Sequence, residues 1–312
     1  MPETILVTAA ARPQPSLRLY GQIFKETAVK WSDDNAARLG ASLAFYSILS
    51  LGPLLVLLLA TAGFVFGEEA ARGQIVGQVS GLIGRESAEM VQGLIAASAN
   101  KGQGLIASLL SFATLLIGAS GVFSQLQDAL NTIWRTDAPQ GRRWWHLITD
   151  RLLSFSVVLL GGVLLVISLL VSTTLTAASE HTTLLLPTLA IALQTANFIS
   201  SFLVMTVLFA LIFKILPDAK IAWRDVWTGA ALTAILFTIG KSLIGLYLGY
   251  AGVASTYGAA GSVVVILVWV YYSAQILFLG AEFTEAYARA LGSRAAYSKK
   301  PAADEAAGRS TL

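Results

Sequence analysis

Six long apolar stretches constrain the fold of this chain more than any other feature. They cover residues 39–66, 105–133, 152–176, 184–213, 227–250 and 261–284. Each exceeds the about 20 residues that an α-helix needs to cross roughly 30 Å of hydrocarbon. Charged residues make up only 12% of the chain, about half their share in a typical soluble domain, so polar surface is too scarce for a soluble fold. The sequence therefore predicts an all-α, polytopic membrane bundle of six transmembrane helices.

The basic residues are distributed unevenly between the two sides of these stretches. Most of the 21 Lys and Arg residues lie before the first stretch or after the second, fourth and sixth. The segments on the opposite side contain only Arg72, Arg85 and Lys101. Because cytoplasmic segments of membrane proteins carry the excess of Lys and Arg, we predict that both termini are cytoplasmic.

The ends of the chain and one connecting segment differ from the apolar stretches. Residues 1–16 and 291–312 are predicted to be disordered tails around a transmembrane domain at 17–290. Residues 17–35 mix apolar and basic side chains, which predicts an amphipathic helix at the cytoplasmic interface. We interpret that helix as an anchor in preference to a gate or lipid sensor. Residues 68–104 have helical apolar spacing and are predicted to form an external amphipathic helical hairpin.

Polar side chains at membrane depth are the candidate functional residues, because an ionisable group there costs at least about 2.5 kcal/mol. The candidates for a substrate path are Lys241, Gln275, Asn197, Ser50, Tyr46 and Gln125. A polar network nearer the cytoplasm is predicted to contain Arg38, Asp128, Asn131, Glu282 and Glu285. Within it we expect Arg38 to pair with Asp128 or Glu282. Polar residues also join helices by hydrogen bonds, so a structural role remains the alternative.

Lys241 is the most unusual of these residues. It lies deep in the fifth stretch, with no carboxylate expected at its own depth. We interpret it as the closed end of a polar cavity that opens to the cytoplasm. Pro53 and Pro217 are the predicted helix hinges, because proline removes a backbone donor. Gly245-x-x-x-Gly249 permits close helix contact, within one chain or in a homo-oligomer.

No pattern typical of catalysis or metal binding is found in the sequence. The chain has no cysteine and only two histidines. It contains no Gly-x-Ser-x-Gly or His-Glu-x-x-His motif, and its soluble carboxylates are scattered. The cluster Arg142-Arg143-Trp144-Trp145 is better explained by an interfacial belt than by nucleic-acid binding. We therefore expect no enzymatic activity, no cofactor, no metal site and no nucleic-acid partner.

Four blocks of the sequence resemble the YihY/BrkB family of bacterial inner-membrane proteins. They lie at 34–53, 126–134, 216–223 and 257–283. The matching motif residues are Arg38, Tyr46, Pro53, Asn131, Pro217, Asp218, Tyr257, Gly258 and Glu282. The resemblance implies a six-helix protein of the inner (plasma) membrane, without an established activity. Some members carry a ribonuclease BN label that is regarded as a misassignment, and others have been suggested to export lipid-related molecules.

Three functions follow from this reading. The leading hypothesis is a transporter or flippase-like exporter of a lipid-related or anionic amphiphile, with Lys241 binding its charged group. The alternative is a non-transporting scaffold or lipid-binding regulator of the envelope, which recruits an envelope protein through residues 68–104. A ribonuclease is the least favoured, because no catalytic constellation is present. The sequence identifies neither the substrate nor the energy source.

Overall fold

The computed structural model describes residues 16–50, 73, 121–136, 160–168, 170–179, 187–250 and 261–293. Within these ranges the chain is helical apart from short turns and connections, which confirms the all-α prediction. Four helices there are long and apolar enough to cross a membrane: Leu160–Ser179, Thr188–Ile215, Trp223–Tyr247 and Val263–Ala290. Nearly all of the predicted external hairpin at 68–104, most of the two tails and much of the first two spans lie outside the described residues. The count of six spans therefore stays a prediction.

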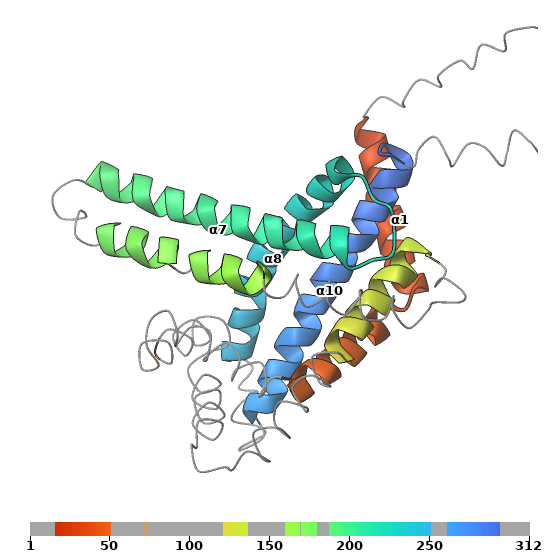
Figure 1. Cartoon of the computed structure of the whole chain (residues 1–312), viewed down its shortest axis with the longest axis horizontal. Helices are drawn as coiled ribbons and strands as arrows, with labels where there is room; N and C mark the ends of the chain where they lie inside the picture. The colour runs from red at the N-terminus through yellow and green to blue at the C-terminus, as the bar shows by residue number, and fades with distance from the viewer. Residues whose placement is uncertain are drawn as a thin grey trace, which may run out of the picture.

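The labelled helices are α1 (Leu17–Asp33), α7 (Pro187–Ile215), α8 (Trp223–Tyr250) and α10 (Gly261–Ala290) (Figure 1). Two shorter helical segments, 36–50 and 121–134, belong to the first two predicted spans. They pack against each other, since the Ser42 hydroxyl donates to Gln125 Oε1 at 2.9 Å. Gly121 gives the Tyr46 ring room, because a Cβ there would lie 2.7 Å from Tyr46 Cδ1.

Helix α1 begins with a side-chain cap and ends in a sharp turn. Ser16 is the N-cap, and its hydroxyl accepts from the Leu19 amide at 3.3 Å. After α1, Asn35 adopts φ 52°, a left-handed conformation that Asn tolerates better than most residues. Ile23 packs on Phe283 and Ala286 of α10. The predicted N-terminal helix is thus observed, and it is bound to α10 along one face.

Helices α8 and α10 approach closely through two matched pairs of residues. A Cβ on Gly229 would lie 1.7 Å from Thr284 Oγ1, and one on Gly280 would lie 1.9 Å from Thr233 Oγ1. Each threonine hydroxyl donates to the carbonyl four residues earlier, Thr233 to Gly229 at 2.7 Å and Thr284 to Gly280 at 2.6 Å. The hydroxyls are therefore satisfied without a cross-helix partner, and the glycines supply the space that the opposite threonine fills.

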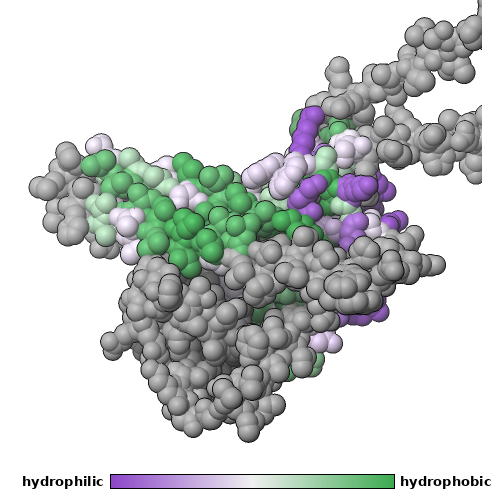
Figure 2. Space-filling model, in the orientation of Figure 1, coloured by the Kyte–Doolittle hydropathy of each residue, from purple (hydrophilic) through white to green (hydrophobic). Residues whose placement is uncertain are grey.

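The Leu160–Ser179 helix and α7 form a hairpin that extends away from the other described helices (Figure 1). The hairpin is held by contacts such as Leu208 against Gly161. The face of the hairpin seen in Figure 2 is mostly apolar, whereas hydrophilic residues gather where α1 meets the end of α10. Exposed apolar residues on a helix of this length are typical of a surface that faces lipid.

The main core joins α7, α8 and α10 to the helical segments 36–50 and 121–134. Its largest fully buried side chains include Trp134, Phe213 and Phe278. Phe209 stacks on Phe213 and meets Phe237 edge-on, so aromatic contacts fasten α7 to α8. This core lies beside the pocket and the charged cluster described next.

Candidate functional site

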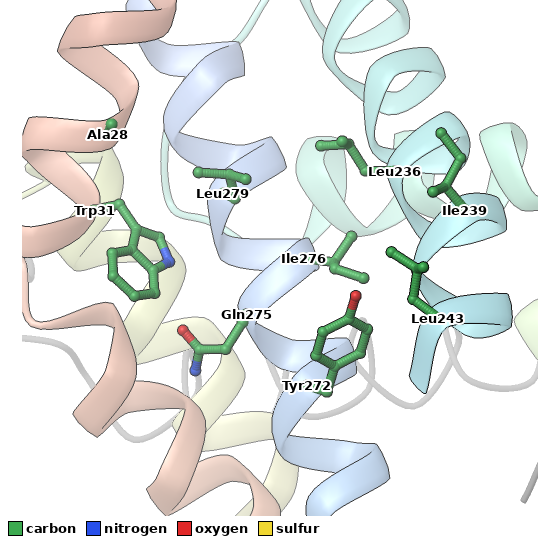
Figure 3. Close-up of a pocket in the computed structure, with 10 residues that line it drawn as sticks. Ala28, Trp31, Leu236, Ile239, Leu243, Tyr272, Gln275, Ile276 and Leu279 are labelled. Carbon is green, nitrogen blue, oxygen red and sulfur yellow. The ribbon is translucent and has the colours of Figure 1, made fainter. Parts of the chain in front are cut away.

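A pocket of about 450 Å³ lies between α1, α8 and α10 (Figure 3). Its lining residues are Ala28 and Trp31 from α1, Leu236, Ile239, Gly240 and Leu243 from α8, and Tyr272, Gln275, Ile276 and Leu279 from α10. Ile239 and Leu243 are more than half exposed, so the pocket borders the apolar surface of α8. The volume falls in the range of about 300–1,000 Å³ that is typical of small-molecule sites.

Polar groups in this pocket come mainly from its α10 wall. Gln275 Nε2 donates to the Ala36 carbonyl at 3.3 Å, while its Oε1 is buried without a hydrogen-bond partner among the described residues. Tyr272 points its hydroxyl toward α8 (Figure 3). A Cβ on Gly240 would lie 3.1 Å from that hydroxyl, so Gly240 makes room for the tyrosine. The pocket therefore combines mostly apolar walls with a few polar atoms.

Four charged side chains connect α1 and α10 beyond the pocket. Lys30 forms an ion pair with Glu285, and their side chains are only 7% and 4% exposed. Glu26 lies 3.7 Å from Lys30 Nζ and also pairs with Arg289. Arg289 Nε lies 2.8 Å from Glu285 Oε1. Two acids and two bases thus neutralise one another at the contact between the two helices.

A second acidic pair lies next to this charged cluster. Glu282 of α10 is fully buried, and neither of its carboxylate oxygens has a hydrogen-bond partner among the described residues. Asp34 follows α1 and lies beside Glu282, because Lys30 pairs with Glu285 on one side of it and the Ala36 carbonyl accepts from Gln275 on the other. The depth of Glu282 along its helix marks it as a candidate in the sequence, whereas neither Asp34 nor Lys30 is marked in this way. Both residues belong to the segment predicted to lie at the interface, so no depth argument applied to them.

The remaining residues of the predicted cytoplasmic network are divided between separate places. Asn131 Nδ2 donates to Asp218 Oδ2 at 2.9 Å, and Asn131 Oδ1 accepts from the Asp218 amide at 2.8 Å. These bonds fix the 121–134 helix to the connection between α7 and α8. Arg38 and Asp128 are exposed. Among the described residues, no ion pair joins Arg38 to Asp128 or Glu282.

The residues predicted for the substrate path are also separated. Only Gln275 lines the pocket. Ser50 is buried and donates to the Ser47 carbonyl at 3.0 Å, while Asn197 on α7 has a buried Oδ1 without a partner among the described residues. Tyr46 and Gln125 lie between the 36–50 and 121–134 helices.

The predicted role of Lys241 receives no support from the pocket. Lys241 is exposed on α8 and is absent from the pocket lining, although Gly240 beside it is a lining residue. The polar cavity predicted to end at this lysine is therefore not the pocket seen here, whose walls are apolar. A role for Lys241 in binding an anion stays a prediction. Of the predicted hinges, Pro217 is buried in the connection between α7 and α8, and Pro53 lies outside the described residues.

The long apolar helices and their exposed apolar faces define an integral α-helical membrane protein. The chain belongs to the virulence factor BrkB family, whose model matches residues 27–305. This match confirms the resemblance inferred from the sequence blocks.

The names of the relatives describe them as membrane proteins and give no activity. The chain is 31% identical over 265 residues to a UPF0761 membrane protein of Verminephrobacter eiseniae, covering 80% of this chain and 58% of the relative. It is 28% identical over 260 residues to a UPF0761 membrane protein of Psychromonas ingrahamii, covering 80% of this chain and 82% of the relative. The UPF0761 membrane protein YihY of Salmonella newport is 30% identical over 171 residues, 54% of this chain and 56% of the relative. The chain thus spans less than two thirds of several relatives. No solved structure matches it.

Proposed function

We propose that this protein is a transporter or flippase-like exporter of an amphiphilic, lipid-like molecule in the bacterial inner membrane. The observation that carries the proposal is the pocket between α1, α8 and α10, with a volume of about 450 Å³ and mostly apolar walls. A pocket of this kind accommodates an acyl chain better than a water-soluble metabolite, because its walls offer few hydrogen-bond partners.

The position of the pocket supports access from the membrane. Ile239 and Leu243 lie at its α8 side and are 54% and 57% exposed. An apolar chain that moves sideways from the bilayer would remain in contact with apolar groups throughout. Gln275 Oε1 and the Tyr272 hydroxyl are the groups that we assign to the polar end of the ligand. The proposal needs no enzymatic step, no cofactor and no nucleic acid.

Filling the pocket tests this proposal. Ala28 lines the pocket and is exposed, so Ala28→Trp occupies the space without disturbing a buried contact. Val29, the next residue, is 50% exposed and does not line the pocket, which makes Val29→Trp the matched control. Native mass spectrometry of protein released from lipid nanodiscs should detect a retained lipid in wild type and Val29→Trp, and lose it in Ala28→Trp. Equal lipid adducts in all three proteins would reject the pocket as a lipid site.

Movement of the lipid requires a separate assay. Proteoliposomes with a fluorescent short-chain phospholipid report transfer between leaflets, and Ala28→Trp should slow that transfer relative to Val29→Trp. Lipid retention without any transfer by the wild type would favour a lipid-binding regulator of the envelope over a transporter. In the same assay, Lys241→Met tests the predicted anion site. If Lys241 binds the charged group, this variant should slow the transfer of anionic lipids more than the transfer of neutral lipids.

A further inference from the structure

The Glu282 carboxylate is buried without groups that would stabilise a negative charge. Glu282 is fully buried, and both of its carboxylate oxygens lack a hydrogen-bond donor among the described residues. An ionised carboxylate in such surroundings is strongly unfavourable unless it is paired or neutralised. Ionisable groups retained inside a membrane domain mark ion or proton pathways by default.

The neighbour of Glu282 is another carboxylic acid. The Asp34 amide donates to the Lys30 carbonyl at 2.8 Å, which fixes Asp34 at the end of α1. Asp34 Oδ2 is buried and has no donor in the described part of the chain. The contacts Lys30–Glu285 before this point and Ala36–Gln275 after it bracket the two residues, so the antiparallel packing of the chain against α10 places Asp34 beside Glu282. Two ionised carboxylates are both acceptors, so they form a hydrogen bond only when one proton lies between them.

The other charged groups at this place do not supply the missing positive charge. Lys30 and Arg289 are already paired with Glu26 and Glu285 in the neutral cluster of four. Among the described residues, Arg135 at the end of the 121–134 helix is the further charged group that interacts with Glu282. These seven groups comprise four acids and three bases. One negative charge is left over, and a single proton balances it.

We propose that Asp34 and Glu282 form a proton-binding site in which one shared proton holds α1 against α10. A proton suits this place better than a metal ion. Hard cations such as Ca²⁺ require about six to eight oxygen ligands. Within the described part of the chain, no group of three or more acidic, histidine or cysteine residues could hold a metal.

The site lies in register with the pocket. Trp31 and Asp34 are three residues apart on one side, and Leu279 and Glu282 are three residues apart on the other, so each pair lies about one helical turn apart. Loss of the shared proton leaves two facing carboxylates, whose repulsion loosens the contact between α1 and α10. Because these helices form two walls of the pocket, proton release would alter the space for a bound lipid. This coupling rests on the proposed function, whereas the proton site itself does not.

Infrared difference spectroscopy of the full-length protein in nanodiscs tests the proton site directly. The wild type should show the C=O stretching band of a protonated carboxylic acid, and this band should disappear as the pH is raised. Its frequency should shift when H₂O is replaced by D₂O. Glu282→Gln removes the acid, and Asp34→Asn removes the excess negative charge and supplies an amide donor. Both variants should lose the band. Asp33→Asn, an exposed carboxylate beside Asp34, is the matched control and should keep it.

The outcomes separate the two proposals. A band of equal size in wild type, Glu282→Gln and Asp34→Asn would overturn the proton site. Removal of the band at constant pH by added Na⁺ would overturn it as well, in favour of a cation site. Loss of the band in both variants with no lipid retained by any protein would keep the proton site and reject the pocket function. If lipid is retained, its release from the wild type should follow the same pH titration as the band, and in Asp34→Asn it should be independent of pH.

Discussion

At the scale of single residues, a few short side chains with several hydrogen bonds each join one helix to its neighbours. Asn131 is the clearest case, since its amide both donates to Asp218 and accepts from the Asp218 backbone. The Thr136 hydroxyl also donates to Asn131 Oδ1 at 3.2 Å. One side chain thus organises the end of one helix and the connection between two others.

Replacing Asn131 should weaken that junction. Asn131→Ala removes three hydrogen bonds and is expected to lower the free energy of unfolding by about 1–3 kcal/mol. Gln127→Ala is the matched control, because Gln127 reaches Asp218 only at 3.4 and 3.5 Å. Thermal unfolding in detergent should show a clear loss for Asn131→Ala and a small one for Gln127→Ala. Equal losses would contradict the assigned role of Asn131.

Lys30 illustrates the cost of removing one member of a buried pair. Lys30→Met removes the buried ion pair with Glu285 and leaves that carboxylate buried, so we expect a loss of roughly 3 kcal/mol in the free energy of unfolding. Lys25 is exposed on the same helix, and Lys25→Met should change stability by less than about 0.5 kcal/mol. Chemical unfolding of the two variants beside wild type provides the comparison. A Lys30→Met protein as stable as Lys25→Met would mean that the pair contributes little.

At the scale of helices, the contact between α8 and α10 depends on glycines that admit a threonine from the opposite helix. The arrangement is reciprocal, since Gly229 receives Thr284 and Gly280 receives Thr233. Gly245, which the sequence marked for close packing, has no described residue within 4 Å of its ideal Cβ position. Glycines on the same helix therefore differ in role, because only those that face a neighbouring helix provide space for its side chains.

This difference gives a direct comparison of two glycine substitutions. Gly280→Ala places a methyl group 1.9 Å from Thr233 Oγ1, so α8 and α10 must separate, at an expected cost of about 1–3 kcal/mol. Gly245→Ala meets open space and should be neutral or stabilising by up to about 1 kcal/mol. Melting temperatures in detergent or nanodiscs will distinguish them. A large loss in Gly245→Ala would instead indicate that this face packs against another copy of the chain.

At the scale of the whole molecule, polar and apolar surfaces are segregated. Hydrophilic residues gather where α1 meets the end of α10, and the visible face of the α7 hairpin is mostly apolar (Figure 2). The ion pairs between Glu26 and Arg289 and between Lys30 and Glu285 lie at that polar end. The start of α1 and the end of α10 thus lie at the same end of the molecule, and the side of the membrane that this end faces stays a prediction.

The orientation can be measured with single cysteines, because the chain has none of its own. Leu17 and Lys220 are exposed and are predicted to be cytoplasmic, so Leu17→Cys and Lys220→Cys should react with an impermeant maleimide only after cells are permeabilised. Thr188, exposed at the start of α7, is predicted to lie on the opposite side, and Thr188→Cys should react in intact cells. The reverse pattern would invert the topology and place the proton site on the external side.

The sequence by itself determined the class of the protein. Apolar runs of more than about 20 residues can satisfy their backbone in lipid only as helices, so the helical fold followed from length and composition. The family followed from ordered motifs at 34–53, 126–134, 216–223 and 257–283. Depth along a helix also marked Gln275 and Glu282, because depth depends only on position in the chain.

Only the tertiary structure decided which of these residues meet. Arg38 was expected to pair with Asp128 or Glu282, yet the observed pairs between α1 and α10 join Lys30 to Glu285 and Glu26 to Arg289. The pocket and the placement of Asp34 beside Glu282 also arise between segments far apart in the sequence. Periodicity identifies the residues that share a helix face. The rotation and crossing of helices select the partner, and these depend on packing such as the fit of Thr233 and Thr284 against glycine.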